Sequence, residues 1–235
     1  MNETFLALLT AHLVADFPLQ PDWTIRRKKR ASVLALHMAA VIAVAIAALG
    51  AWPPELLLIL LTTHLIADVV KTRALTDSLQ SFAADQAVHL CVLLGLAVLF
   101  PQTVAQGWWP SLAGERLNIY FAGLCLLSGL IVGLNVGAIV IQKATAPFAA
   151  QMGGEIVGLE NGGLYIGWLE RALVMLLVLA NQAGSVGFMI AAKSIFRFGE
   201  HKSAEYIIIG TFMSFGWGLL AASLTLQAIK HWLPV

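Results

Sequence analysis

Long apolar stretches, separated by short polar or charged segments, make up most of this 235-residue chain. Many of them approach the roughly 20 apolar residues that an α-helix needs to cross the hydrocarbon core of a bilayer. The pattern predicts about eight membrane-spanning helices, with approximate bounds 3–18, 32–49, 55–70, 84–100, 118–141, 164–179, 185–196 and 205–229. The sixth and seventh stretches are short and carry charges, so a re-entrant pair would also fit them. The expected fold class is an all-α, polytopic transmembrane helix bundle.

The composition favours the same class, because such a chain has too few polar residues to cover a water-exposed surface. Hydrophobic residues make up 59% of the chain and charged residues 11%, and the mean hydropathy is +0.83. Soluble domains carry about 25% charged residues. The first apolar stretch lacks a basic n-region and a small-residue cleavage site, so we expect a retained helix rather than a signal peptide.

The positions of the charges predict how the helices are oriented. The run Arg26-Arg27-Lys28-Lys29-Arg30 cannot enter the bilayer, and the positive-inside rule places it on the cytoplasmic side. With eight spans, both termini then lie outside, and of the 14 lysines and arginines only Arg116 and Lys230 fall on the outer side. A topology anchor is a sufficient role for the basic run, and binding of anionic lipid headgroups is the alternative.

The first half of the chain contains an internal repeat with an offset of 52 positions. The segments AHLVADFPLQ and THLIADVVK each place a histidine and an aspartate four residues apart within an apolar run. Three polar pairs share the offset: His12 and His64, Asp16 and Asp68, and His37 and His89. Because similarity at a fixed offset is typical of repeated units, we interpret residues 1–100 as a duplicated helical hairpin with four helices. Residues 101–235 are then a second helical half, packed on the first within a single membrane domain.

The predicted orientation brings ionisable side chains from four helices to the cytoplasmic third of the membrane. They are His12, Asp16, His37, His64, Asp68, Asp85 and His89. At about 1.5 Å of rise per residue, all of them lie within roughly 12 Å of the inner boundary. Ionisable groups inside a membrane are costly, about 2.5–3.5 kcal/mol for an aspartate at a helix centre. Three neighbouring carboxylates would also repel one another.

A divalent cation would relieve both costs, and we predict that these seven residues bind one or two metal ions. A mixed set of imidazole and carboxylate ligands suits Zn best, with Mn, Fe or Ni as alternatives, whereas Ca prefers an all-oxygen shell. Two ions about 3.5–4 Å apart could clamp the attacking and leaving oxygens of a phosphoester. The alternatives are a proton path without metal and a purely structural set of salt links.

Cationic residues near the same predicted face are candidates for binding a phosphate. Lys71 lies within one turn of Asp68 and could contact a phosphate as a point charge, or could simply anchor the helix at the interface. In the second half, Lys193 and Arg197 could form a cationic wall beside an anionic headgroup. The alternative is a charge-balanced network that includes Glu170 and holds the last helices together.

Six segments carry a resemblance to a known family: AHLVADFPLQ, HLIADVVK, DQAVHL, IGWLERALV, IAAKSIFRFGE and AEYIIIGTFMSF. Together they resemble the uncharacterised bacterial membrane family called domain of unknown function 3307 (DUF3307), over roughly residues 1–225. This family has no activity that could be transferred to the chain. The resemblance therefore implies a multi-pass protein of the bacterial inner membrane and leaves its function open.

Three functions are compatible with a buried metal site. The first is a metal-dependent hydrolase that cleaves a phosphoester on a lipid or amphiphile. Its candidate general bases are Asp16, Asp68 and Asp85, and its candidate phosphate ligands are Lys71, Lys193 and Arg197. The second is a divalent-metal or proton-coupled transporter, although transporters usually bind their substrate near the midplane of the bilayer. The third is a non-catalytic scaffold stabilised by metal.

The expected partners are the lipid bilayer and, for the hydrolase, an amphiphile that carries a phosphate. No nucleic-acid partner is expected. The sequence leaves open whether the chain forms an oligomer.

Overall fold

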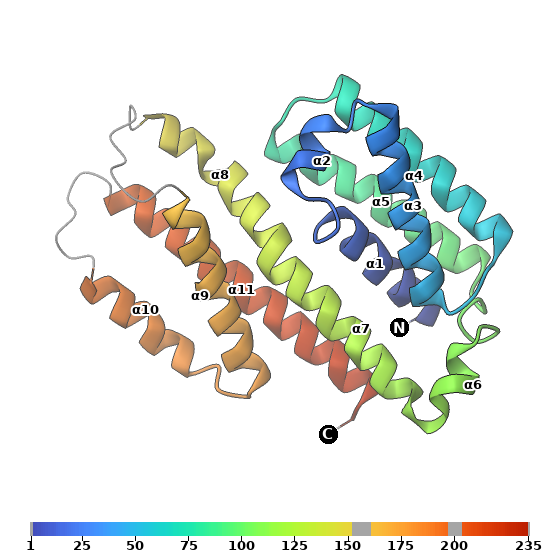
Figure 1. The fold of residues 1–235 in the computed structure, drawn as a ribbon. Helices are drawn as coiled ribbons and strands as arrows, with labels where there is room; N and C mark the ends of the chain where they lie inside the picture. Colours follow the sequence, from blue (N-terminus) through green and yellow to red (C-terminus); the bar gives the residue numbers. More distant parts are fainter. Residues whose placement is uncertain (1, 152–160, 197–203, 235) are drawn as a thin grey trace. The chain divides into compact units, whose positions relative to one another are not determined.

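The structure, a computed structural model, describes residues 2–151, 161–196 and 204–234 (Figure 1). All regular secondary structure in these ranges is helical, which confirms the all-α class. The elements are α1 (Glu3–Asp16), α2 (Asp22–Arg27), α3 (Ala31–Leu49), α4 (Pro54–Ala74), α5 (Leu79–Leu99), α6 (Trp109–Ala113), the 3₁₀-helix η1 (Gly114–Arg116), α7 (Leu117–Ile131), the π-helix η2 (Val132–Val136), α8 (Gly137–Gln151), α9 (Gly162–Leu179), α10 (Ser185–Phe196) and α11 (Ala204–Trp232).

Five helical stretches within the described residues are long and apolar enough to cross a membrane. They are Ala31–Leu49, Leu79–Leu99, Trp109–Ala150, Gly162–Leu179 and Ile208–Trp232. The other three predicted spans do not meet this description. The helices α1 and α10 have only 14 and 12 residues, and α4 carries Glu55, Asp68, Lys71 and Arg73 along its 21 residues. Several potential membrane-spanning helices are thus confirmed, whereas the number of eight is not.

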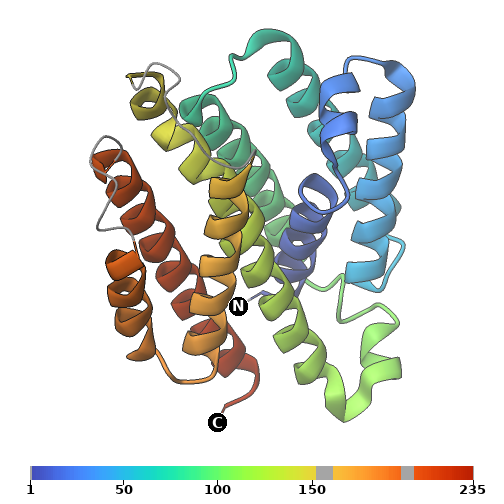
Figure 2. The same ribbon diagram turned by 60° about the vertical axis from the view of Figure 1, so that its left-hand side comes forward.

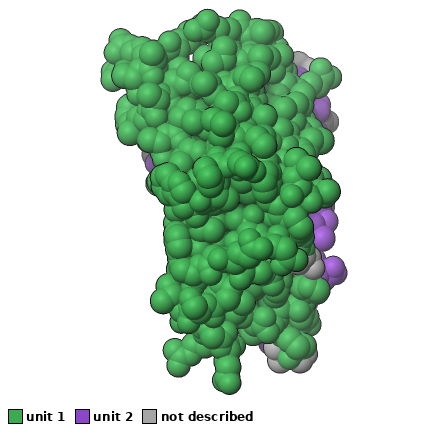
Figure 3. Space-filling model, turned by 90° about the vertical axis from the view of Figure 1, so that its right-hand side faces the viewer, with its two compact units in different colours: residues 1–131, 228–235 green, residues 132–227 purple. Residues whose placement is uncertain are grey.

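The chain forms two compact units, which Figure 3 shows in different colours. The first unit consists of residues 1–131 and 228–235, and the second consists of residues 132–227. All seven predicted metal ligands belong to the first unit.

In the first unit, α1 packs against α3, α5 and α7, and α4 packs against α3 and α5 (Figures 1 and 2). Small side chains permit the close approach of α1 to its neighbours, because Ala7, Ala11 and Ala15 follow one another every four residues and are at most 3% exposed. The hydroxyl groups of Thr10 on α1 and Ser128 on α7 form a buried hydrogen bond of 2.8 Å.

Each helix around the site has a polar half and an apolar half. His12 and Asp16 lie in the C-terminal half of α1, and His37 lies in the N-terminal half of α3. His64 and His89 lie at the midpoints of α4 and α5, Asp68 lies in the C-terminal half of α4, and Asp85 lies in the N-terminal half of α5. The opposite halves contribute apolar residues to the core, among them Leu6, Leu8, Leu49, Leu56, Leu60, Leu93 and Leu96. The first unit therefore separates a buried polar cluster from a buried apolar core.

In the second unit, the guanidinium group of Arg171 on α9 is buried against the π-helix η2. Arg171 is 2% exposed, and it donates to the carbonyl oxygens of Gly133 and Leu134 at 3.0 and 3.3 Å and to the hydroxyl group of Ser214 at 3.1 Å. A π-helix interrupts the regular hydrogen-bond ladder of an α-helix. The arginine therefore serves as the donor for carbonyl oxygens at this interruption, and its own burial is compensated by these hydrogen bonds.

We expect the substitution Arg171→Ala to destabilise the second unit, because the carbonyl oxygens of Gly133 and Leu134 would lose their donor. The cost is about 1–3 kcal/mol for each buried group left unsatisfied. Thermal unfolding of the purified protein in detergent would show this loss as a lower midpoint. The matched control is Arg116→Ala, which removes an exposed arginine and should leave the midpoint unchanged. Equal midpoints for the two variants would contradict the proposed role of Arg171.

Candidate metal site

All seven predicted ligand residues are buried in the first unit, each with at most 9% of its surface exposed. The helix α1 carries His12 and Asp16, α3 carries His37, α4 carries His64 and Asp68, and α5 carries Asp85 and His89. Residues four positions apart share one face of a helix, so each pair points to the same side. The structure thus gathers imidazoles and carboxylates from four helices in one buried cluster.

Three of these residues form a first potential metal site, which we call the Asp16 group: Asp16, His37 and His64. The Nε2 atoms of the two histidines lie 3.3 Å apart, and Asp16 Oδ1 lies 3.3 Å from His64 Nε2 and 3.5 Å from His37 Nε2. A direct hydrogen bond between a charged imidazole and a carboxylate would measure about 2.7–2.9 Å. Donors that share a tetrahedral cation at 2.0–2.1 Å stand about 3.3–3.4 Å apart. The observed spacing therefore matches a shared cation better than direct hydrogen bonds.

The three carboxylates differ in the cations that neutralise them. Lys28 Nζ donates to Asp68 Oδ1 at 2.7 Å, and Lys71 Nζ donates to Asp85 Oδ2 at 2.5 Å. Asp16 has no lysine or arginine partner in the described part of the chain, and only imidazoles face it. Its Oδ1 atom is buried without a hydrogen-bond partner, which is unfavourable for a carboxylate. Asp16 is thus the carboxylate with the greatest need of an additional cation.

Asp68 is placed to act as a fourth ligand of the Asp16 group. Its Oδ2 atom lies 3.4 Å from His37 Nε2 and 3.8 Å from His64 Nε2, and it too is buried without a hydrogen-bond partner. Lys28 holds the other carboxylate oxygen, and such outer contacts orient a ligating carboxylate. Two imidazoles and two carboxylates would supply the four ligands of a tetrahedral site.

A second group, the three-histidine group, consists of His12, His64 and His89. His89 Nδ1 lies 2.9 Å from the carbonyl oxygen of Asp85. A carbonyl oxygen can only accept, so Nδ1 carries the proton and Nε2 keeps a lone pair. His12 Nε2 lies 3.3 Å from Gln86 Oε1. This amide oxygen also can only accept, so Nε2 of His12 carries the proton and Nδ1 keeps the lone pair. Both atoms with lone pairs, His89 Nε2 and His12 Nδ1, are buried without a hydrogen-bond partner, as expected of metal ligands.

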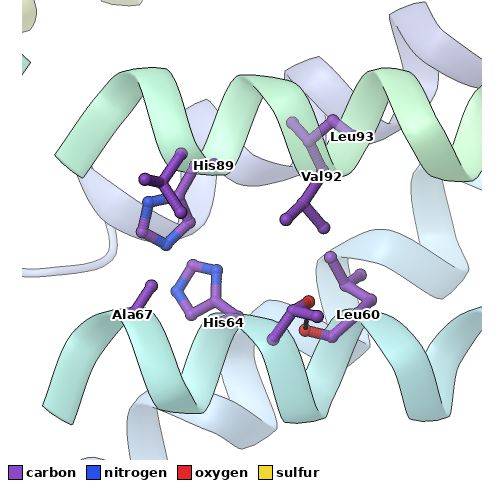
Figure 4. A pocket seen from close by; sticks show the side chains of 8 residues that line it. Leu60, His64, Ala67, His89, Val92 and Leu93 are labelled. Carbon is purple, nitrogen blue, oxygen red and sulfur yellow. Dashed lines mark hydrogen bonds between the residues drawn. The ribbon is translucent and has the colours of Figure 1, made fainter. Parts of the chain in front are cut away.

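A small pocket opens between α4 and α5 beside the three-histidine group (Figure 4). In Figure 4 the imidazoles of His64 and His89 project into the gap between the two helices, and Leu60, Val92 and Leu93 continue its apolar wall. The pocket has room for about one water molecule. The three-histidine group therefore borders space that water or a small ligand could occupy.

Lys28 and Gln20 also contact the site, although the sequence pattern predicted no site role for them. Lys28 is 8% exposed, and Gln20 Nε2 lies 3.1 Å from the ring nitrogens of His37. Hydropathy cannot distinguish one lysine within a run of five cations. A weak signal was present in the spacing, because Gln20, Thr24 and Lys28 recur every four residues and would share one face of a helix.

The cations proposed for phosphate binding are largely paired in the structure. Lys71 is bonded to Asp85, and Lys193 pairs with Glu170 in the second unit at 2.5 Å. The Lys193–Glu170 pair is the kind of contact expected of a charge-balanced network. Arg197 lies outside the described residues.

Comparison with known proteins supports the family resemblance for the part of the chain that carries the site. Residues 4–112 match a family model described as protein of unknown function (DUF3307). The match contains all seven buried histidines and aspartates and ends before the second-half segments included in the sequence-based resemblance. No curated protein and no solved structure matches the chain. The chain therefore resembles the DUF3307 family over residues 4–112.

Proposed function

We propose that this chain is a metalloprotein of the bacterial inner membrane whose first unit holds a divalent cation in the Asp16 group. The observation that carries the proposal is the spacing of 3.3–3.5 Å between Asp16 Oδ1, His37 Nε2 and His64 Nε2. Five helices of sufficient length and hydropathy support the membrane location. The full topology of about eight spans, with both termini outside, belongs to this proposal.

The duplication of a helical hairpin within residues 1–100 is also part of the proposal. At the offset of 52 positions, His12 on α1 corresponds to His64 on α4, and His37 on α3 corresponds to His89 on α5. Corresponding helices thus contribute corresponding ligands to one cluster, which supports a common origin of the two hairpins.

Zinc is the cation that fits this ligand set best, with one or two ions per chain. Octahedral magnesium at 2.0–2.1 Å would place neighbouring donors about 2.9–3.0 Å apart, and calcium prefers oxygen ligands alone. The Asp16 group combines imidazole nitrogens with a carboxylate oxygen at wider spacings. Manganese, iron and nickel remain alternatives because they accept the same ligand types.

The proposed chemistry is hydrolysis of a phosphoester on a lipid or amphiphile. Catalytic zinc sites have three protein ligands and keep one position open, and the three-histidine group has three ligands beside a pocket between α4 and α5. A bound cation would supply Lewis-acid chemistry there. Asp85 lies next to this group, with its Oδ1 atom 3.7 Å from His89 Nδ1, and is a candidate general base. Lys71, which is bonded to Asp85 and has 37% of its side chain exposed, could contact the phosphate of a substrate.

A transporter is less well supported, because the apolar halves of the helices close the first unit beyond the polar cluster. Leu6, Leu56, Leu60, Leu93 and Leu96 in this region are at most 4% exposed. A path for a metal ion or a proton would need polar groups or water there. These buried leucines therefore favour a reaction at the polar cluster over transport of a metal ion or a proton through the unit.

A non-catalytic scaffold stabilised by metal is the second candidate. The observation that favours it is the position of Asp68, whose Oδ2 atom could close the Asp16 group as a fourth ligand. Structural zinc sites have four protein ligands and no open position. The two candidates differ at the three-histidine group: the hydrolase requires a catalytic cation there, and the scaffold does not.

We expect the purified protein to contain about one zinc ion or more per chain, measured by elemental analysis of detergent-solubilised protein. The variant His64→Ala should lose the metal, because His64 belongs to both groups. His231→Ala removes a histidine outside the cluster and serves as the control, with metal content equal to that of the unmodified protein. Undiminished metal in the His64 variant would refute the site.

For the hydrolase, we expect zinc-loaded protein to release phosphate from a lipid phosphomonoester such as phosphatidic acid. Asp85→Asn should lower the rate by about 100-fold or more, the range for loss of a general base, while zinc content is retained. Asp77→Asn is the control, because it makes the same change in a different segment. Zinc-loaded protein without activity on phosphomonoesters would favour the scaffold, and equal rates for both variants would remove Asp85 from the mechanism.

A further inference from the structure

The segment between α1 and α3 contacts the Asp16 group through one face only. Residues 19–30 of this segment, which we call the basic strap, include the short helix α2. Gln20, Thr24 and Lys28 follow one another every four residues, and the last two are 7% and 8% exposed. Gln20 lies 3.1 Å from the His37 ring nitrogens, and Lys28 donates to Asp68 at 2.7 Å. The inward face of the strap thus touches two residues of the proposed metal site.

The outward face of the basic strap combines large apolar side chains with cations. Leu19, Trp23 and Ile25 are 49%, 49% and 52% exposed. The exposed cations beside them are Arg26, Arg27, Lys29 and Arg30. Among the residues that the structure describes, none of these four cations has a carboxylate partner.

This surface has the composition of a membrane-interface segment. Tryptophan and isoleucine side chains enter the boundary between headgroups and acyl chains, and clustered arginines and lysines attract anionic phospholipids. A role as topology anchor requires the charges alone. It does not require that Trp23 and Ile25 face outward while Lys28 reaches a buried aspartate.

We propose that the basic strap docks on anionic phospholipid headgroups and thereby couples the membrane surface to the cation affinity of the Asp16 group. This inference depends on the proposed metal binding and is independent of the proposed hydrolysis. A docked strap holds Lys28 against Asp68 Oδ1, which directs Asp68 Oδ2 toward His37 and His64. A strap that leaves the surface takes Lys28 with it, and Asp68 loses the contact that orients it.

The coupling between lipid binding and cation binding must act in both directions. If anionic lipid strengthens cation binding by a given factor, the cation must strengthen binding of the strap to anionic lipid by the same factor. Coupling factors between two sites typically fall between about 5 and 150. The basic strap has four outward cations and two contacts with the site. We expect such a strap to change the cation affinity by a factor of about ten, which lies within this range.

The test measures zinc affinity by competition with a chelator for protein in lipid nanodiscs. One set of nanodiscs contains phosphatidylcholine alone, the other a mixture with phosphatidylglycerol, and empty discs of each kind correct for zinc bound by lipid. Nanodiscs expose both faces of the bilayer, so a change of orientation cannot imitate the effect. We expect zinc to bind about tenfold more tightly in the anionic discs.

Two variants separate the two faces of the strap. Replacing its four outward cations by glutamine (Arg26, Arg27, Lys29 and Arg30) should abolish the lipid dependence but preserve zinc binding in neutral discs. Lys28→Met should also bring the ratio of the two affinities close to one, because the link to Asp68 is gone. Arg73→Gln removes an exposed cation outside the strap and should keep the full ratio.

The possible results are distinguishable. Equal zinc affinity in the two lipids for the unmodified protein would overturn the coupling and leave the metal site intact. Soluble glycerophosphate that reproduces the effect in neutral discs would overturn docking on a membrane surface. Absence of zinc binding in both lipids would refute the metal site itself.

Discussion

The burial of ionisable side chains among apolar helices is the constraint on which the first unit depends. Seven histidines and aspartates are at most 9% exposed, and a buried charge is strongly unfavourable unless it is paired. Lysines neutralise Asp68 and Asp85, so the uncompensated negative charge lies on Asp16. One more positive charge is therefore needed where His37 and His64 converge on Asp16. A divalent cation would supply this charge and would use the donor spacing already present.

The fold provides a rigid frame for this cluster, because every proposed ligand lies on a helix rather than in a loop. Sites on regular elements hold their ligands more precisely than sites on loops. The carbonyl oxygen of Asp85 fixes the ring of His89 within the same helix, and Gln86 contacts His12 from α5. The same helices also pack through small apolar residues such as Ala7 and Ala11. The packing core and the polar cluster are therefore separate parts of the same four helices.

The sequence indicated much of the cluster because its ligands follow the helical period. The pairs His12–Asp16 and His64–Asp68 are visible at four-residue spacing. The number of spans was harder to predict, because hydropathy averaged over a window does not show where a helix ends, and α1 stops at Asp16. The role of Lys28 is set by tertiary contacts alone, and its neighbours in the basic run have the same charge without sharing its burial.

The shared position of His64 determines how two cations could bind to this cluster. Its Nε2 atom belongs to the Asp16 group, where it lies 3.3 Å from both Asp16 Oδ1 and His37 Nε2. An imidazole has only two ring nitrogens, so a cation in the three-histidine group would have to use Nδ1 of the same ring. Binding there would remove the remaining ring proton and would bring two cations to one side chain, and both effects would oppose it. The Asp16 group should therefore fill first, and the three-histidine group only at higher metal concentration.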